Sequence, residues 1–179
     1  MKLEGRKIAM TDLETTGDVF GVHEILEIGL VVFDQKTFEI TDTLNIKIKP
    51  LHIENAVPEA LTVNGYKAED WTEAVSLKEA MEIYAEKVKD AVFCAYNATF
   101  DWGFISDAFR TTGVINPLST KENHDRLDLL SIAFAKGLDK SQSLSLRSAC
   151  DMFGVPKEPT VHRAINGAET NYELFKKIV

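Results

Sequence analysis

One stretch decides how the rest of this sequence is interpreted: Ala9-Met10-Thr11-Asp12-Leu13-Glu14-Thr15-Thr16-Gly17. Extended backbone sends alternate side chains to opposite faces, so a strand here places Ile8 and Met10 on one face. The same period puts Asp12 and Glu14 on that face, where further apolar side chains would be expected. Two carboxylates at the end of a buried strand are costly unless a positive charge lies between them, and a hard divalent cation satisfies both. The alternative is a strand that frays into solvent after Met10 and carries two ordinary surface acids.

Size and composition indicate one globular domain over residues 1–179. The chain has 179 residues, of which 45% are hydrophobic, enough for a core without disulfides. Cys94 and Cys150 lie in apolar contexts and have no metal-ligand spacing, so we expect buried thiols of a reducing compartment. The charged start, residues 1–4, lacks the apolar region of a signal peptide, and no apolar run is long enough for a membrane span. We therefore expect a cytoplasmic protein with no membrane partner.

The charge balance limits how this protein would bind nucleic acid. The formal net charge is −8, which argues against a broad basic groove along a duplex. An enzyme that holds a short nucleic-acid end through bound metal ions is still compatible with this charge, because the ions reverse the local sign of an acidic site.

Hydrophobic patterns predict an α/β sheet of mixed direction. Residues 26–33 form an almost continuous apolar run, typical of a strand covered on both faces, in which Glu27 is either a rim residue or a partner of the site. Residues 40–48 alternate as a half-exposed antiparallel strand that Pro50 ends, and residues 91–96 form a short buried strand. The strands come first as a three-strand meander and then alternate with helices, which predicts an antiparallel part followed by parallel strands.

Capping residues locate the expected helices. One helix opens at Pro58 and ends at Asn64-Gly65, and another has Ser76 and Glu79 at capping-box spacing. The others are a helix that Thr99 caps, one over residues 126–136 that Gly137 ends, one over 144–153 that Gly154 ends, and a last helix from about 163 to 179.

Two further residues have the chemistry of a catalytic site. Asp101 lies one helical step from Phe104 and Ile105, on the apolar side of its helix and near the carboxyl end of a strand. It is either a ligand or an acid that stabilises the helix dipole. His162 stands where a loop meets the last helix, and it is either a proton acceptor or a plain capping histidine.

Taken together, these segments resemble a known family. The ordered set Asp12 to Gly17, Asn97 with Phe100-Asp101, and His162-Arg163-Ala164 is similar to the DEDDh 3′–5′ exonucleases. Within that family, the proofreading subunits and domains of bacterial replicative DNA polymerases look closest. The resemblance extends over essentially the whole chain and includes residues 58–61, 64–65, 125–130, 143–146 and 154–156.

The resemblance implies a ribonuclease-H-like fold and a two-metal hydrolysis of phosphodiesters. By position, Asp12 would bridge both ions, Glu14 would help to hold the first and Asp101 the second. His162 would deprotonate the attacking water. Oxygen ligands favour two Mg²⁺ or Mn²⁺ ions. The residues expected around the terminal nucleotide are Thr15, Asn97 and Phe100.

The sequence departs from the family pattern at one position. A fourth metal-binding aspartate is expected five residues after the histidine, where this chain has Gly167. Glycine has no ligand atom, so we expect the first metal position to be weakened. Among its neighbours, Asn166, Glu169 and Thr170 are not convincing replacements by helical geometry. Three explanations of the glycine stay open. It is an inactivating substitution, or the metal site works more weakly with water in place of the carboxylate, or the protein is a family member that binds nucleic acid without cleaving it.

We therefore expect a metal-dependent 3′–5′ exonuclease that releases nucleoside monophosphates from the 3′ end of single-stranded DNA. It would be of the proofreading type, with a DNA polymerase as a candidate partner, and Gly167 would impair it. On this basis Gly167→Asp should raise activity about tenfold or more. The alternatives are a catalytically silent nucleic-acid-binding or polymerase-associated subunit of the same fold, and an RNA exonuclease.

Overall fold

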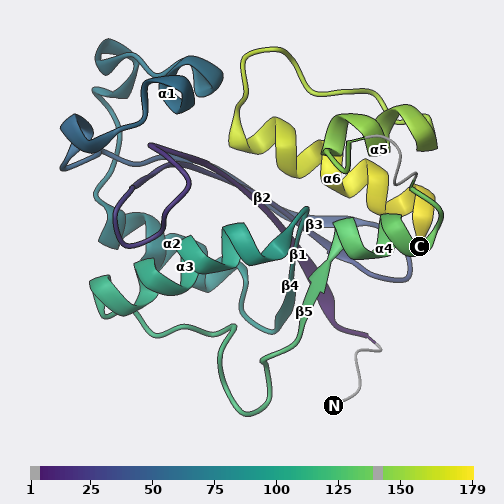
Figure 1. Cartoon of the computed structure of the whole chain (residues 1–179). Coiled ribbons are helices and arrows are strands. Elements are labelled where there is room, and N and C mark those ends of the chain that lie inside the picture. The colour runs from purple at the N-terminus through teal and green to yellow at the C-terminus, as the bar shows by residue number, and fades with distance from the viewer. Residues whose placement is uncertain (1–4, 139–142) are drawn as a thin grey trace.

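The computed structural model describes residues 5–138 and 143–179 and places a five-stranded sheet at its centre. The strands are β1 (Lys7–Thr15), β2 (Ile25–Asp34), β3 (Ile40–Lys47), β4 (Ala91–Ala95) and β5 (Arg126–Asp128). Their spatial order is β3-β2-β1-β4-β5, with β1 to β3 antiparallel and β4 and β5 parallel to β1 (Figure 1). The expected mixed sheet is confirmed, and β1 lies in the middle of it.

Helices cover both faces of this sheet (Figure 1). Side chains of α2 (Leu77–Lys87) and α3 (Ala98–Thr112) pack with Ala9 and Leu13 of β1. Side chains of α4 (Leu129–Ala135), α5 (Leu146–Phe153) and α6 (Ala164–Ile178) pack on the opposite face, with Ile8 and Met10. The two-residue period expected for β1 is therefore confirmed. The remaining elements are α1 (Pro58–Asn64) and two 3₁₀ turns, η1 (Ile53–Asn55) and η2 (Ala68–Trp71).

Local capping signals located several elements correctly. Gly65 ends α1 in the left-handed region at φ 60°, and the Ser76 hydroxyl accepts a hydrogen bond from the backbone N–H of Glu79 at 3.2 Å. Gly154 ends α5 in the same left-handed conformation. The strand over residues 26–33 is buried on both faces, and both cysteines are free thiols in the core, as expected.

Three boundaries differ from the sequence interpretation. The N-cap of α3 is Asn97, in the left-handed region, and not Thr99. The helix expected over 126–136 starts only at Leu129, because Arg126 to Asp128 pair in parallel with β4, and the Asp128 side chain then caps α4. The helix expected from residue 144 begins at Leu146, because the hydroxyl of Ser145 accepts from Ser148 N–H and fixes the start there.

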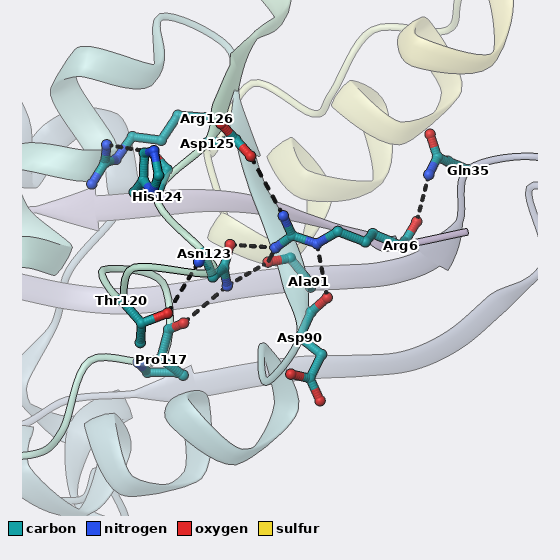
Figure 2. Close-up of polar contacts among 10 residues, drawn as sticks. All are labelled: Arg6, Gln35, Asp90, Ala91, Pro117, Thr120, Asn123, His124, Asp125 and Arg126. Carbon is teal, nitrogen blue, oxygen red and sulfur yellow. Dashed lines mark hydrogen bonds and ion pairs between the residues drawn. The ribbon is translucent and has the colours of Figure 1, made fainter. Parts of the chain in front are cut away.

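A polar network closes the end of the sheet where β1 begins (Figure 2). The Arg6 guanidinium donates to the carbonyl of Ala91 at 3.0 Å and to the side-chain oxygen of Asn123, and it pairs with Asp125 at 3.6 Å. The Asn123 amide in turn donates to the carbonyls of Ala91 and Pro117 at 3.0 and 2.9 Å. The network thus holds the loop before β5 against the start of β4.

Within residues 5–138 and 143–179, no helix has the length and apolar character that crossing a membrane requires. The charged start at residues 1–4 lies outside the described residues.

Candidate active site

The carboxylates of the opening stretch lie at the end of β1, opposite the end that Arg6 closes. In the antiparallel pairing with β2, Asp12 stands across from Gly29 and Glu14 across from Glu27. Glu14 is 8% exposed and Glu27 is 1% exposed. The strand does not fray into solvent, because both acids remain in the ladder and Thr15 is still paired beyond them. The surface-acid alternative is therefore excluded for Glu14.

Two glycines let α6 sit directly on this part of the sheet. A Cβ at Gly29 would lie 2.0 Å from the carbonyl oxygen of Ala164, at the first residue of α6. A Cβ at Gly167 would lie 2.2 Å from Oδ2 of Asp12. At Gly29 the overlap is with backbone, so that position requires glycine in this packing. At Gly167 the overlap is with the end of a side chain, so a larger residue there requires the Asp12 carboxylate to rotate away. Gly167 is therefore more than a missing ligand, because it admits the Asp12 carboxylate against the helix.

Asp101 approaches the same carboxylates from the other layer. It lies in the first turn of α3 and is 4% exposed, although α3 packs on the face opposite α6. Burial raises the pKa of the Asp101 carboxyl, and the charge of Asp12 raises it further, whereas the backbone of Leu13 lowers it. The structure thus brings Asp12 and Glu14 of β1 together with Asp101 of α3 at one end of β1, as the sequence predicted.

The carboxyl groups of this cluster have raised pKa values, because they are buried close together and few positive charges lie near them. Burial raises the pKa of Asp12 to about 8 and that of Glu14 to about 9, and the negative charge of Asp12 adds to the shift of Glu14. The positive charge of Arg163 lowers the pKa of Glu14 but does not offset its burial. Buried carboxyl groups that repel one another are a signature of functional sites.

Glu27, which the sequence left open, anchors the start of α6. Its carboxylate accepts from the backbone N–H of Ala164 at 3.2 Å and from Arg163 at 3.4 Å. An acid at a helix N-terminus is stabilised by the unpaired N–H groups and by the helix dipole. Glu27 is therefore a partner of the site that fixes the helix, and its own charge raises the pKa of Glu14 across the β1–β2 ladder.

His162 stands on the segment that enters α6, as expected, with its side chain 36% exposed. Its backbone N–H donates to the carbonyl of Val63 in α1 at 3.1 Å. Its ring Nδ1 lies 3.7 Å from Oε1 of Glu158. Glu158 is a residue that sequence reasoning missed, and the available signal was an acid four positions before the candidate base.

A cavity of about 350 Å³ opens beside the carboxylates. Its walls include Glu14, Thr15 and Phe100, together with apolar side chains of α1 such as Val63. Two of the three residues expected around a terminal nucleotide thus line it. Asn97 does not belong to the described lining. It is exposed at the N-cap of α3, and its role stays a prediction.

The donor set fits a hard divalent cation. Its members are carboxylates whose charge no described lysine or arginine neutralises by an ion pair, and one fully buried side-chain oxygen of the described residues, Oδ1 of Asn171, has no hydrogen-bond partner. The Asn171 amide nitrogen lies 3.4 Å from Oδ1 of Asp12. Within the described part of the chain, no three acids, histidines or cysteines are yet arranged as a closed metal cage. Binding of a cation here would therefore involve a rotation of side chains such as Asp12, whose carboxylate lies against α6.

Comparison with known proteins shows what this arrangement is similar to. Residues 10–175 match the model of the RNase T exonuclease family. Ribonuclease T of Shewanella sp. (strain ANA-3) is 32% identical over 183 residues, which cover 94% of this chain and 79% of that protein. The 3′–5′ DNA exonuclease Cap18 of Escherichia coli is 29% identical over 188 residues, which cover 99% and 94%.

Longer proteins match over part of their length. The chain spans 18% of the 3′–5′ exonuclease DinG of Staphylococcus epidermidis, at 32% identity. Among solved structures, E. coli exonuclease I in complex with a dT13 oligonucleotide superposes with a TM-score of 0.81 at 14% identity. That match covers 96% of this chain and 40% of the other, and it confirms the expected ribonuclease-H-like fold.

Proposed function

The chain belongs to the DEDD-type 3′–5′ exonucleases, and on that premise we propose that it removes nucleotides from the 3′ end of single-stranded DNA with the help of Mg²⁺ or Mn²⁺. The single observation that carries this proposal is the convergence of Asp12, Glu14 and Asp101 beside a nucleotide-sized cavity. Association with a DNA polymerase and a cytoplasmic location stay predictions.

The residues divide the work as follows. Asp12, Glu14 and Asp101 would hold the divalent cations, which when bound stabilise the charge on the attacking and leaving oxygens of the phosphodiester. Thr15 and Phe100 line the cavity beside Glu14, where they would receive the terminal nucleotide. His162, half-exposed at the start of α6, would accept the proton of the attacking water.

The choice of DNA over RNA is part of the proposal. It is supported by the resemblance to proofreading exonucleases and by the match to a DNA exonuclease over almost the full length of both chains. RNA is the second candidate, because the chain is also similar to ribonuclease T. A binding site distinguishes RNA from DNA through the 2′-hydroxyl. DNA and RNA oligomers of the same sequence therefore test which of the two is the substrate.

A catalytically silent binding subunit is the other alternative, and Gly167 favours it. It predicts binding of 3′ ends without turnover.

The test is incubation of a 5′-labelled single-stranded DNA, and of the RNA of the same sequence, with the protein and Mg²⁺ or Mn²⁺. We expect a ladder of products that shorten one nucleotide at a time, faster for DNA, and none in EDTA. Faster shortening of the RNA would show that RNA, and not DNA, is the preferred substrate. Tight binding of the oligomer without shortening in either metal would instead support the silent subunit.

A further inference from the structure

The loop between β1 and β2 has a defined shape, because hydrogen bonds close it at its base and within its turn. At the base, the backbone N–H of Thr16 donates to the carbonyl of Glu24, and the N–H of Glu24 donates to the Thr16 hydroxyl, both at 2.8 Å. Within the loop, Nδ1 of His23 accepts from the backbone N–H of Val19 at 3.0 Å. The His23 ring lies over Gly17, where a Cβ would be 2.5 Å from its Nδ1.

This loop forms one wall of the cavity that we assign to the terminal nucleotide. Gly17 and Asp18 line the cavity, and Phe100 lines it as well. Phe100 belongs to the first turn of α3, next to Asp101. The position of the loop relative to α3 therefore decides how far apart these two walls of the cavity lie.

Phe20 connects the loop to α3. Its ring packs edge-on against Phe104, with ring centroids 6.3 Å apart and an interplanar angle of 78°. The same ring lies over Gly103, where a Cβ would be 2.6 Å from its Cδ1 and 2.8 Å from its Cε1. Phe104 in turn contacts Phe100, with ring centroids 5.1 Å apart. Three aromatic rings thus form a row from the loop to the cavity.

The stability of the fold does not explain the pair of Phe20 and Gly103. Phe20 is 54% exposed, so much of its ring gains nothing from burial. Gly103 lies in the interior of α3, where glycine costs about 1 kcal/mol relative to alanine. Alanine would overlap the ring of Phe20, so glycine permits the contact. The contact itself, which fixes the loop against the helix, accounts for both residues.

We propose that Phe20 is a positioning residue for the terminal nucleotide: through its contact with Gly103, it holds the loop wall of the cavity at a fixed distance from Phe100. This inference rests on the proposed function, since it concerns how the same cavity receives the 3′ nucleotide. Phe20 acts through Gly17 and Asp18, which line the cavity, and not by contact with the nucleotide.

The test measures the affinity for dTMP, a product of the proposed reaction, by calorimetry in the presence of Mn²⁺. We expect Phe20→Ala to weaken dTMP binding by about two- to tenfold, the contribution of one aromatic contact. Gly103→Ala should weaken it to the same extent, because its Cβ displaces the ring, although alanine favours the helix. Val22→Ala is the matched control. It removes a side chain of the same loop that is 58% exposed, and it should bind dTMP as the unmodified chain does.

Two further measurements separate positioning from a general effect on the fold. The double variant of Phe20→Ala and Gly103→Ala should bind dTMP no more weakly than either single variant, because both changes remove one contact. In stepwise shortening of the DNA oligomer, KM should rise by the same factor while kcat stays within about twofold, because the contact acts on binding.

The proposal is wrong if Phe20→Ala or Gly103→Ala binds dTMP as Val22→Ala does, or if the two losses multiply in the double variant. It is also wrong if the unmodified chain does not bind dTMP. In each of these cases stepwise shortening by the unmodified chain would leave the proposed function standing. Binding of dTMP with the expected losses but without any shortening would instead overturn the proposed function and support the positioning role.

Discussion

The two ends of β1 handle buried charge in opposite ways. At the start of the strand, Arg6 is matched by two carbonyls, the Asn123 amide and Asp125, so its positive charge and its donors have partners (Figure 2). At the other end, Asp12 and Glu14 lie on the same face of the strand with raised pKa values. Their compensation among the described residues is a hydrogen bond from Asn171 to Asp12 and the nearby charge of Arg163 for Glu14. One strand thus carries a stabilising network at one end and an electrostatic deficit at the other. The deficit lies where the proposed divalent cation would bind.

The contrast between the two ends of β1 should change most when the carboxylate of Asp12 is removed. Asp12→Asn should reduce nucleotide release by at least about a thousandfold, since metal stabilisation of the transition state is worth several kcal/mol. The metal-free protein should become more stable, because a repelling buried carboxyl is lost. Release rates and chemical denaturation in EDTA measure the two effects. A variant that is less stable and still active would contradict the assigned deficit.

The pH dependence of stability should differ between the metal-free and metal-loaded protein. The pKa values of Asp12 and Glu14, about 8 and about 9, lie above those of the unfolded chain, so the folded state holds more protons between pH 4 and 9. Stability in EDTA should therefore fall as pH rises through this window, by up to about 1.4 kcal/mol per pH unit for each proton.

With Mn²⁺ present, the ionised carboxylates gain a partner and the fall should be much smaller. Denaturation midpoints from pH 5 to 8.5 measure the difference. Asp12→Asn should flatten the curve in EDTA, and equal slopes with and without the metal would contradict the assignment.

Mutations in the network around Arg6 should change the free energy of unfolding without changing metal binding or nucleotide release. Asn123→Ala removes an acceptor of Arg6 and a donor to two carbonyls, and it should destabilise the fold by about 1–3 kcal/mol. Mn²⁺ affinity and nucleotide release should stay within about twofold at a temperature where the variant is folded. A loss of metal binding in this variant would show that the two ends are not independent.

The smallest effect concerns the glycine that faces Asp12. Gly167→Ala adds a Cβ that overlaps Asp12 and should weaken Mn²⁺ binding, whereas Gly167→Asp adds the same carbon together with a ligand. We expect the aspartate variant to be at least about tenfold more active than the alanine variant. Steady-state release of nucleotide from the same oligomer measures the ratio. Equal activities would show that a carboxylate at this position has no role.

The sequence predicted the fold best where local rules decide. The two-residue period of β1 identified both faces of the strand, and the Ser76 cap identified the start of α2. Arg126 to Asp128 were assigned to a helix because nothing local distinguishes three strand residues from a helix start. Their pairing with β4 is a tertiary interaction, and such interactions override helix propensity.

The same distinction applies to the candidate site. Asp12, Glu14 and Asp101 were recognised in ordered motifs, and the structure brings them together. Glu158 was missed because its placement beside His162 depends on the path of the segment before α6, and its position four residues before the candidate base was the only signal in the sequence. The sequence also interpreted Gly167 only as a lost ligand, since the contact of α6 with Asp12 is visible only in three dimensions.

The contacts of Arg163 have a consequence for how the enzyme would respond to its substrate. Its guanidinium bonds both Glu27 and the carbonyl of Asn64 at the end of α1, while the preceding residue, His162, is bonded through its backbone to Val63. Hydrogen bonds thus connect α1, which lines the proposed nucleotide cavity, with the segment that carries the candidate base His162. A nucleic-acid 3′ end that contacts α1 poorly would shift α1 and, through these hydrogen bonds, the imidazole of His162. The fit of the terminal nucleotide and the rate of its release should therefore change together.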